Sequence, residues 1–165
     1  MEHEAAGLLS SLGVWLEGTA ASAAIRRSLW AYPLASVVHV LGMGLLLGSI
    51  LALDLRLLGF ARALPARPLA RLLVPMAATG VALQIATGAV MLLADAAALL
   101  GHPLMLAKLA LLALALANVL VVHRAAGPGF VLLDGAVPPA VRRGALLSLV
   151  AWPSVAVLGR AIAYF

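Results

Sequence analysis

Four apolar stretches, each long enough to cross a bilayer, fill most of this 165-residue chain. They cover residues 34–53, 72–94, 104–122 and 145–163. The hydrocarbon core of a bilayer needs ~20 apolar residues in helical form, and each stretch is close to that length. The sequence therefore predicts an all-α protein, a four-helix transmembrane bundle for which lipid is the main solvent.

Composition supports a membrane protein and excludes several kinds of site. Apolar residues make up 65% of the chain and charged residues 10%, against ~45–50% and ~25% in soluble domains. The chain has no cysteine, which rules out disulfides, iron–sulfur clusters and thiolate metal sites. The basic residues lie mainly between apolar stretches, where they set membrane orientation. The expected partners are therefore the lipid bilayer and other membrane protein subunits, and not nucleic acid.

The first 33 residues differ from the rest of the chain. Apolar residues at helical spacing are interrupted by Glu17, Arg26 and Arg27, so this segment is not expected to span the membrane. Gly18 followed by Thr19 is typical of one helix ending and another beginning. Residues 1–33 are therefore predicted to form an amphipathic interfacial segment of one or two short helices ahead of the bundle at 34–165. A solvated, partly ordered tail is the alternative.

The connections between the apolar stretches differ in charge. Residues 54–71 and 123–144 are rich in arginine, whereas residues 95–103 contain neither lysine nor arginine. Basic loops stay on the cytoplasmic side of a membrane. We therefore expect a multi-pass protein of the bacterial cytoplasmic (inner) membrane with both termini on the outer side.

Polar side chains from three predicted spans lie at one depth in the outer half of the bundle. His39 and Arg160 are each about five residues, ~8 Å, inside the outer ends of their spans, and Lys108 is about four residues, ~6 Å, inside. Met91 lies near the same level on the second span. Ionisable groups held inside a membrane usually face the bundle interior or a cavity.

This set of residue types fits haem b. A neutral imidazole is a common axial ligand, and a methionine or a second histidine can complete the iron. The propionates need cations, which Lys108 and Arg160 could supply. Gly42 lies about one turn from His39 and would leave room for a flat macrocycle. The predicted cofactor site is therefore His39 as the metal ligand with Gly42, Met91, Lys108 and Arg160. Two alternatives remain open: His39 bonding a neighbouring helix, and Lys108 and Arg160 reaching outward to the membrane surface.

The remaining polar residues are assigned lesser roles. His102, in the outer connection, is a possible second iron ligand, whereas His123 is ~22 Å along the helix from Lys108 and belongs to the other end. Gln84 and Asn118 are expected to make interhelical hydrogen bonds. The methionines are too scattered to indicate a copper site. No nucleophilic triad, phosphate loop or carboxylate pair is present, so no catalytic residue is predicted.

Small residues at four-residue spacing predict close helix contacts. Gly44 and Gly48 form one such pair on the first span, and Gly80, Gln84 and Gly88 form a similar line on the second. Small side chains at this spacing let two helix backbones approach one another. We expect the Gly44 face of the first span to pack against a helix and the opposite, His39 face to hold the cofactor.

Motifs spread over the whole chain carry a family resemblance. They are WLEGT at 15–19, IRRSLWAYP at 25–33, HVLG at 39–42, DLRLLG at 54–59 and GRAIAYF at 159–165. Together they resemble an uncharacterised family of small bacterial four-span membrane proteins, which brings no established function. In that family an acidic residue often stands three positions before the histidine, and Ser36 occupies this place here. The resemblance therefore supplies no acid to orient His39.

A more distant resemblance bears on the cofactor. His39 with Gly42, and the Ala-Lys-Leu around Lys108, are similar to motifs of the copper-resistance D type membrane proteins and the HemJ-type protoporphyrinogen oxidases. In the HemJ-type group the histidine and lysine are tied to haem b and to activity, so the resemblance implies haem at these residues. This chain lacks the aromatic-rich continuation of the first span, and the oxidase activity is not carried over.

Two functions from different classes follow from the sequence. The first is a haem b protein that transfers electrons. The second is a non-catalytic accessory subunit that packs against a larger membrane complex.

Overall fold

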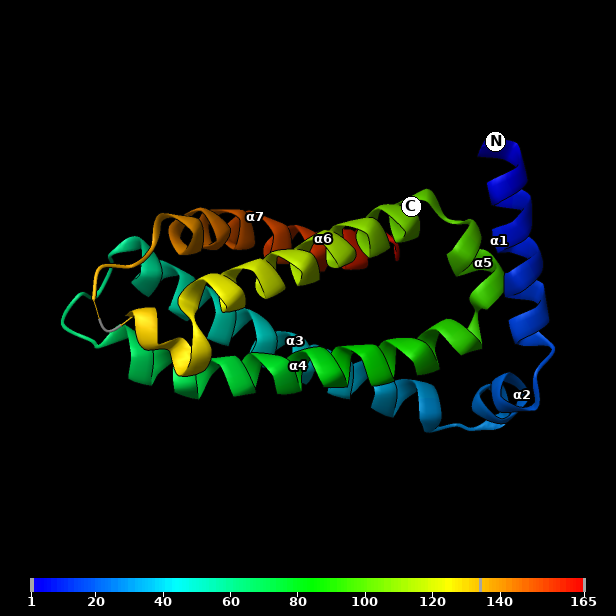
Figure 1. The fold of residues 1–165 in the computed structure, drawn as a ribbon. Helices are drawn as coiled ribbons and strands as arrows, with labels where there is room; N and C mark the ends of the chain where they lie inside the picture. Colours follow the sequence, from blue (N-terminus) through cyan, green and yellow to red (C-terminus); the bar gives the residue numbers. More distant parts are fainter. Residues whose placement is uncertain (1, 134, 165) are drawn as a thin grey trace.

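The computed structural model describes residues 2–133 and 135–164, with side chains from residue 8 onward. The described part of the chain is helical and has no strand, as predicted (Figure 1). In chain order the helices are α1 (Glu2–Glu17), α2 (Ala20–Arg27), α3 (Ala31–Leu58), α4 (Ala66–Ala94), α5 (Ala96–Gly101), α6 (Pro103–Ala126), the 3-10 helix η1 (Pro128–Leu133) and α7 (Pro139–Ala161).

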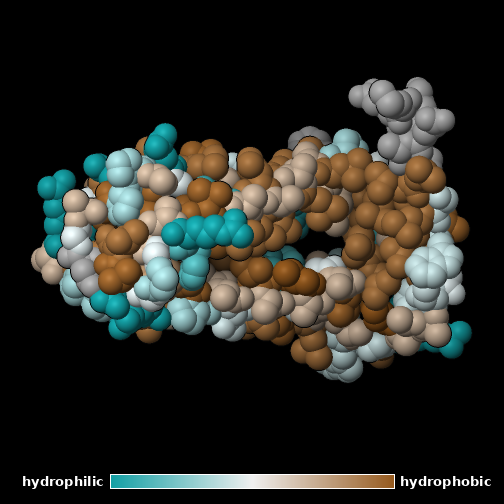
Figure 2. Space-filling model, viewed as in Figure 1, coloured by the Kyte–Doolittle hydropathy of each residue, from teal (hydrophilic) through white to brown (hydrophobic). Residues whose placement is uncertain are grey.

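Four of these helices, α3, α4, α6 and α7, are long and apolar enough to cross a membrane. This confirms the predicted number of spans. Apolar side chains cover the sides of the bundle, and hydrophilic ones gather at the end where the arginine-bearing connections lie (Figure 2). Because the apolar side chains face outward, this surface is suited to a lipid environment.

The helices extend beyond the apolar stretches that identified them. Helix α3 continues through Asp54 and Arg56, α4 already contains Arg67, and α7 begins ahead of Arg142 and Arg143. The prediction that these residues lie in loops was wrong. Backbone hydrogen bonds form in a helix whether its side chains are apolar or charged. An apolar stretch therefore marks the part of a helix that lies in hydrocarbon, and the helix itself can extend further.

The spanning helices form an open arrangement. Helix α3 packs against α4 and α7, and α6 packs against α7, whereas α4 and α6 make no contact among the described residues. The order in space is therefore α4, α3, α7, α6, and the molecule has an open side between α4 and α6, which both face the viewer in Figure 1.

Glycines bring α3 and α4 together. A Cβ atom on Gly80 would lie 2.7 Å from the backbone nitrogen of Leu46 and 2.9 Å from the carbonyl oxygen of Gly42. The predicted small-residue contact of α4 is thus confirmed at Gly80. On α3 the prediction was wrong, because Gly44 and Gly48 have no atom within 4 Å of a Cβ position. The 3.6-residue period places Gly42 and Leu46 on the α4 side and turns Gly44 and Gly48 away from it.

The N-terminal helices cover one end of the bundle. Helix α1 runs across this end (Figure 1), and the chain bends by 64° between Leu8–Glu17 and Ala20–Arg27. Thr19 caps α2 by accepting a hydrogen bond from the backbone N–H of Ser22 at 3.2 Å. The predicted helix pair with its break at Gly18 and Thr19 is therefore confirmed.

Polar contacts attach this pair to the bundle. The Glu17 carboxylate accepts a 2.7 Å hydrogen bond from the backbone N–H of Ala97, at the start of α5. The Ser22 hydroxyl donates to the Leu93 carbonyl oxygen at 2.5 Å. Helix α5 was not predicted, because the acid that caps its first turn comes from a distant part of the chain.

The close contact of α3 with α4 gives the first prediction. Gly80→Ala should lower the free energy of unfolding by ~1–3 kcal/mol, because the new methyl group meets backbone atoms that cannot move aside. Gly44→Ala is the matched control, and it should leave stability unchanged or raise it by up to ~1 kcal/mol through helix propensity. Unfolding in detergent micelles measures both. Equal effects of the two substitutions would contradict the assigned helix contact.

Candidate functional site

Two adjoining cavities occupy the half of the bundle next to the N-terminal helices. Their volumes are about 240 Å³ and 210 Å³. All four spanning helices line them, and Figure 2 shows the molecule hollowed between the bundle and the end that α1 covers. We call the two together the outer hollow. The residues that line both cavities are His39, Leu46, Gln84, Lys108, Trp152 and Val155.

A hydrogen bond across two helices holds the ring of His39. Nδ1 of His39 lies 2.8 Å from the hydroxyl oxygen of Thr87, and the same hydroxyl lies 2.5 Å from the Leu83 carbonyl oxygen. A hydroxyl has a single hydrogen, so a Thr87 that donates to Leu83 accepts from His39. On this basis we assign the proton of His39 to Nδ1, which leaves a lone pair on Nε2.

The neighbouring residues of α4 complete this arrangement. The Gln84 amide donates to the backbone carbonyl oxygen of His39, the kind of interhelical bond that the sequence predicted for it. A Cβ atom on Gly88 would lie 3.6 Å from Cε1 of His39, so this position stands beside the imidazole. On one face of α4, Gln84 thus bonds the backbone of His39, and Thr87 and Gly88 lie against its ring.

Lys108 reaches inward from α6. A Cβ atom on Gly159 of α7 would lie 2.9 Å from the Lys108 Nζ and 3.2 Å from its Cε. The lysine stem therefore lies over Gly159, and its charge acts electrostatically on His39. A longer side chain at position 159 would occupy the place of the lysine.

Met91 and Arg160, two other predicted site residues, belong to one of the two cavities. They line the smaller cavity together with His39 and Lys108. Arg160 is exposed at the rim, where it donates to the Tyr164 hydroxyl at 2.5 Å and lies 4.7 Å from the centre of that ring.

Gly42 has a different role from the one expected. A Cβ atom there would lie 2.9 Å from Cβ of Leu83, and Gly42 lines neither cavity. The room beside it is filled by α4, so the absence of a side chain serves helix packing.

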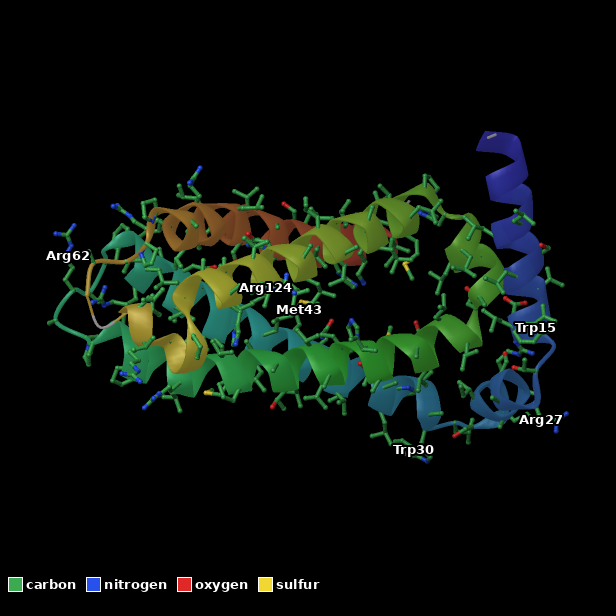
Figure 3. All side chains as sticks on the ribbon, in the orientation of Figure 1. Trp15, Arg27, Trp30, Met43, Arg62 and Arg124 are labelled. Atoms are coloured by element: carbon green, nitrogen blue, oxygen red, sulfur yellow. The ribbon has the colours of Figure 1, made fainter. Side chains whose placement is uncertain are left out.

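Three basic residues at this end of the molecule line neither cavity. His102, the possible second iron ligand, caps α6, its Nδ1 accepting from the Leu104 N–H at 3.2 Å. Arg26 donates to the Ser22 hydroxyl and to the Glu17 carbonyl oxygen. In Figure 3 Arg27 and Trp15 both lie at the end of the molecule opposite Arg62.

Sequence reasoning missed Thr87, which contacts His39, and Trp152, which lines the hollow. Thr87 follows Gln84 by three positions and so shares its helix face, which was the signal available for it. Trp152 is 1% exposed and lines both cavities, and within residues 2–133 and 135–164 its indole nitrogen has no hydrogen-bond partner. A tryptophan on an apolar helix gives no sequence signal that its N–H will be left unpaired.

Comparisons of the chain with protein-family models, with curated proteins and with solved structures found no significant match. The chemistry of the site must therefore be argued from its own residues.

The bond between His39 and Thr87 gives the second prediction. Thr87→Val keeps the side-chain shape but leaves the His39 N–H unpaired, which should cost ~1–3 kcal/mol of stability. In a His39→Leu background the same change should cost much less, because no N–H is left unpaired. Unfolding of the two single variants and the double variant measures this coupling.

Thr79→Val is the control for this cycle. Thr79 is exposed on the same helix and donates only to the Pro75 carbonyl oxygen, so its replacement should change stability by at most ~0.5 kcal/mol. Strictly additive effects of His39→Leu and Thr87→Val would contradict the hydrogen bond.

Proposed function

We propose that this integral membrane protein binds haem b in the outer hollow for electron transfer, with His39 as the iron ligand. The observation that carries the proposal is the 2.8 Å contact between Nδ1 of His39 and the Thr87 hydroxyl, for which we assign the proton to Nδ1 and a free lone pair to Nε2. Histidines that bind metals usually donate their other ring N–H to a fixed acceptor, which sets the tautomer and the ring orientation.

The other residues of the hollow fit the same group. Apolar side chains dominate its lining, and its two cavities together fall in the ~300–1,000 Å³ of typical ligand sites. Thioethers are available from Met43, Met91 and Met105, which line one cavity or the other, and Met43 lies towards the middle of the bundle in Figure 3. When bound, haem supplies one-electron transfer, with a potential set by its ligands and surroundings.

Two cations would serve the carboxylates of the group. Lys108 reaches inside the hollow and Arg160 stands at its rim. Charge-assisted hydrogen bonds to carboxylates are stronger than neutral ones, so these side chains would set the orientation of the macrocycle. The unpaired indole N–H of Trp152 adds a hydrogen-bond donor beside the same hollow.

The second candidate is an accessory subunit of a larger membrane complex. It is favoured by the face of α3 that carries Gly44 and Gly48, which this chain leaves uncovered. Glycines at this spacing accept the close approach of a helix in lipid. In this function the polar groups of the outer hollow would stabilise the bundle without a cofactor.

The absorption spectrum of the purified protein is the third prediction. Protein made in cells supplied with haem should show a Soret band, and His39→Ala should abolish it because the iron ligand is lost. His123→Ala is the matched control and should leave the band, because His123 lies at the other end of α6. Lys108→Ala or Arg160→Ala should shift the redox potential and keep the iron.

Two results would contradict haem binding at His39. One is a Soret band that survives His39→Ala. The other is a folded wild-type protein without any band, which would favour the accessory subunit.

We further propose a bacterial inner-membrane location with both termini outside, which is the fourth prediction. The support is the charge contrast between the connections: the α3–α4 connection and its flanks carry Arg56, Arg62 and Arg67, whereas residues 95–103 carry no lysine or arginine. A periplasmic reporter fused at Gly101 should be active, and the same reporter at Pro65 should be silent. Activity at Pro65 would reverse the orientation and leave the fold unaffected.

A further inference from the structure

A smaller cavity of about 80 Å³ lies at the opposite end of the bundle, between α3, α6, η1 and α7. It is separate from the outer hollow and shares no lining residue with it. Its polar lining residues are Asp54 of α3, Asn118 and His123 of α6, and Ser148 of α7. We call this set the inner polar cluster.

Asp54 is a buried acid without a counterion. It is 6% exposed, and among the described residues its Oδ2 atom has no hydrogen-bond partner and no contact with solvent. Ser148, which is also buried, lines the same cavity. Among the described residues, the polar side chains that line this cavity with Asp54 are neutral, apart from His123.

The basic residues of the surrounding helices are directed elsewhere. Within residues 2–133 and 135–164, His123 is the only basic side chain that lines this cavity. On α3, Arg56 donates to the Leu64 carbonyl oxygen at 2.5 Å. On α4, Arg67 donates to the Gly129 carbonyl oxygen at 3.1 Å. The exposed arginines on the flanking helices are Arg71, Arg124, Arg142 and Arg143.

An ionised carboxylate is costly in this position. Burying a charge without a partner of opposite sign has a high cost in free energy. A buried carboxylate therefore tends to take up a proton and become neutral. A protonated carboxyl is neutral and avoids this cost. Buried ionisable residues of membrane proteins commonly mark proton relays.

The carboxyl of Asp54 and the imidazole of His123 line the same cavity. Its volume of about 80 Å³ is larger than the ~10–15 Å³ that one water molecule needs. His123 is exposed, and its ring centre lies 5.0 Å from that of Phe130. Histidine is the side chain that gains and loses a proton near neutral pH. A buried acid and an exposed base thus share a space that water can fill.

We propose that the inner polar cluster is a proton-exchange site in which Asp54 holds an exchangeable proton and His123 passes it to water. In this step the O–H bond of the Asp54 carboxyl breaks, an N–H bond forms on the imidazole, and the imidazolium then releases the proton to solvent. Charge is conserved, and no other reactant is needed. The route opens at the end of the molecule that carries the basic connections.

A metal ion fits the cluster less well. Hard cations take about six or more oxygen ligands, and this cavity offers side-chain oxygens from Asp54, Asn118 and Ser148.

Infrared spectroscopy of the full-length protein in liposomes is the fifth prediction. The wild-type protein should show the C=O stretch of a protonated carboxyl at neutral pH, and Asp54→Asn should remove it. Asp95→Asn is the matched control, since Asp95 is exposed at the end of α4, and it should leave the band. Circular dichroism and gel filtration establish that each variant is folded.

Exchange kinetics test the route to the surface. After transfer to D₂O, His123→Gln should slow the isotope shift of the Asp54 band several-fold, whereas His102→Gln should not. A wild-type spectrum that matches Asp54→Asn would overturn the proposal, and equal exchange rates in the two histidine variants would overturn the role of His123. A band that Na⁺ removes at constant pH, while choline does not, would replace proton exchange with cation binding. None of these readouts depends on haem.

Discussion

An imidazole inside a membrane bundle needs a hydrogen-bond partner. For His39 this partner is Thr87, and the arrangement of the outer hollow depends on the bond between them. Thr87 contacts both Nδ1 of His39 and the Leu83 carbonyl oxygen, so a side chain and the backbone of α4 together position a ring on α3. The bond requires the two helices to lie close together. Gly42 and Gly80 make that approach possible, and the same contact that stabilises the bundle therefore holds His39 in the wall of the hollow.

The hollow exists because α4 and α6 are held apart. Helix α5 separates the end of α4 from the start of α6, and Glu17 of α1 caps α5 from outside. A backbone N–H at a helix start that would otherwise be unpaired gains a carboxylate partner. The N-terminal helices thus fix the connection at one end. At the other end, buried apolar residues around Leu57, Val141 and Ala145 pack together beside the smaller cavity. The larger cavities therefore lie at the end that the N-terminal helices cover.

Apolar length was enough to predict the spans, and the spacing of Gly80, Gln84 and Gly88 was enough to predict the contact face of α4. Depth along a helix brought His39, Met91, Lys108 and Arg160 to one cavity. The rest required the packed structure. Whether Gly42 or Gly44 faces α4 depends on helix rotation, which an evenly apolar helix does not encode. Asp54 was assigned to a loop because charge marks the end of an apolar stretch, although backbone hydrogen bonds continue past it. Its burial depends on contacts with residues far along the chain.

The proposed haem site requires a free lone pair on Nε2 of His39 that binds iron. Nitrogen NMR of the protein containing isotope-labelled histidine, before and after addition of haem, measures this lone pair. We expect a His39 ring protonated on Nδ1 in the haem-free protein, and an Nε2 signal that haem shifts or broadens beyond detection. A ring protonated on Nε2, or a His39 signal that saturating haem leaves unchanged, would contradict haem binding at His39.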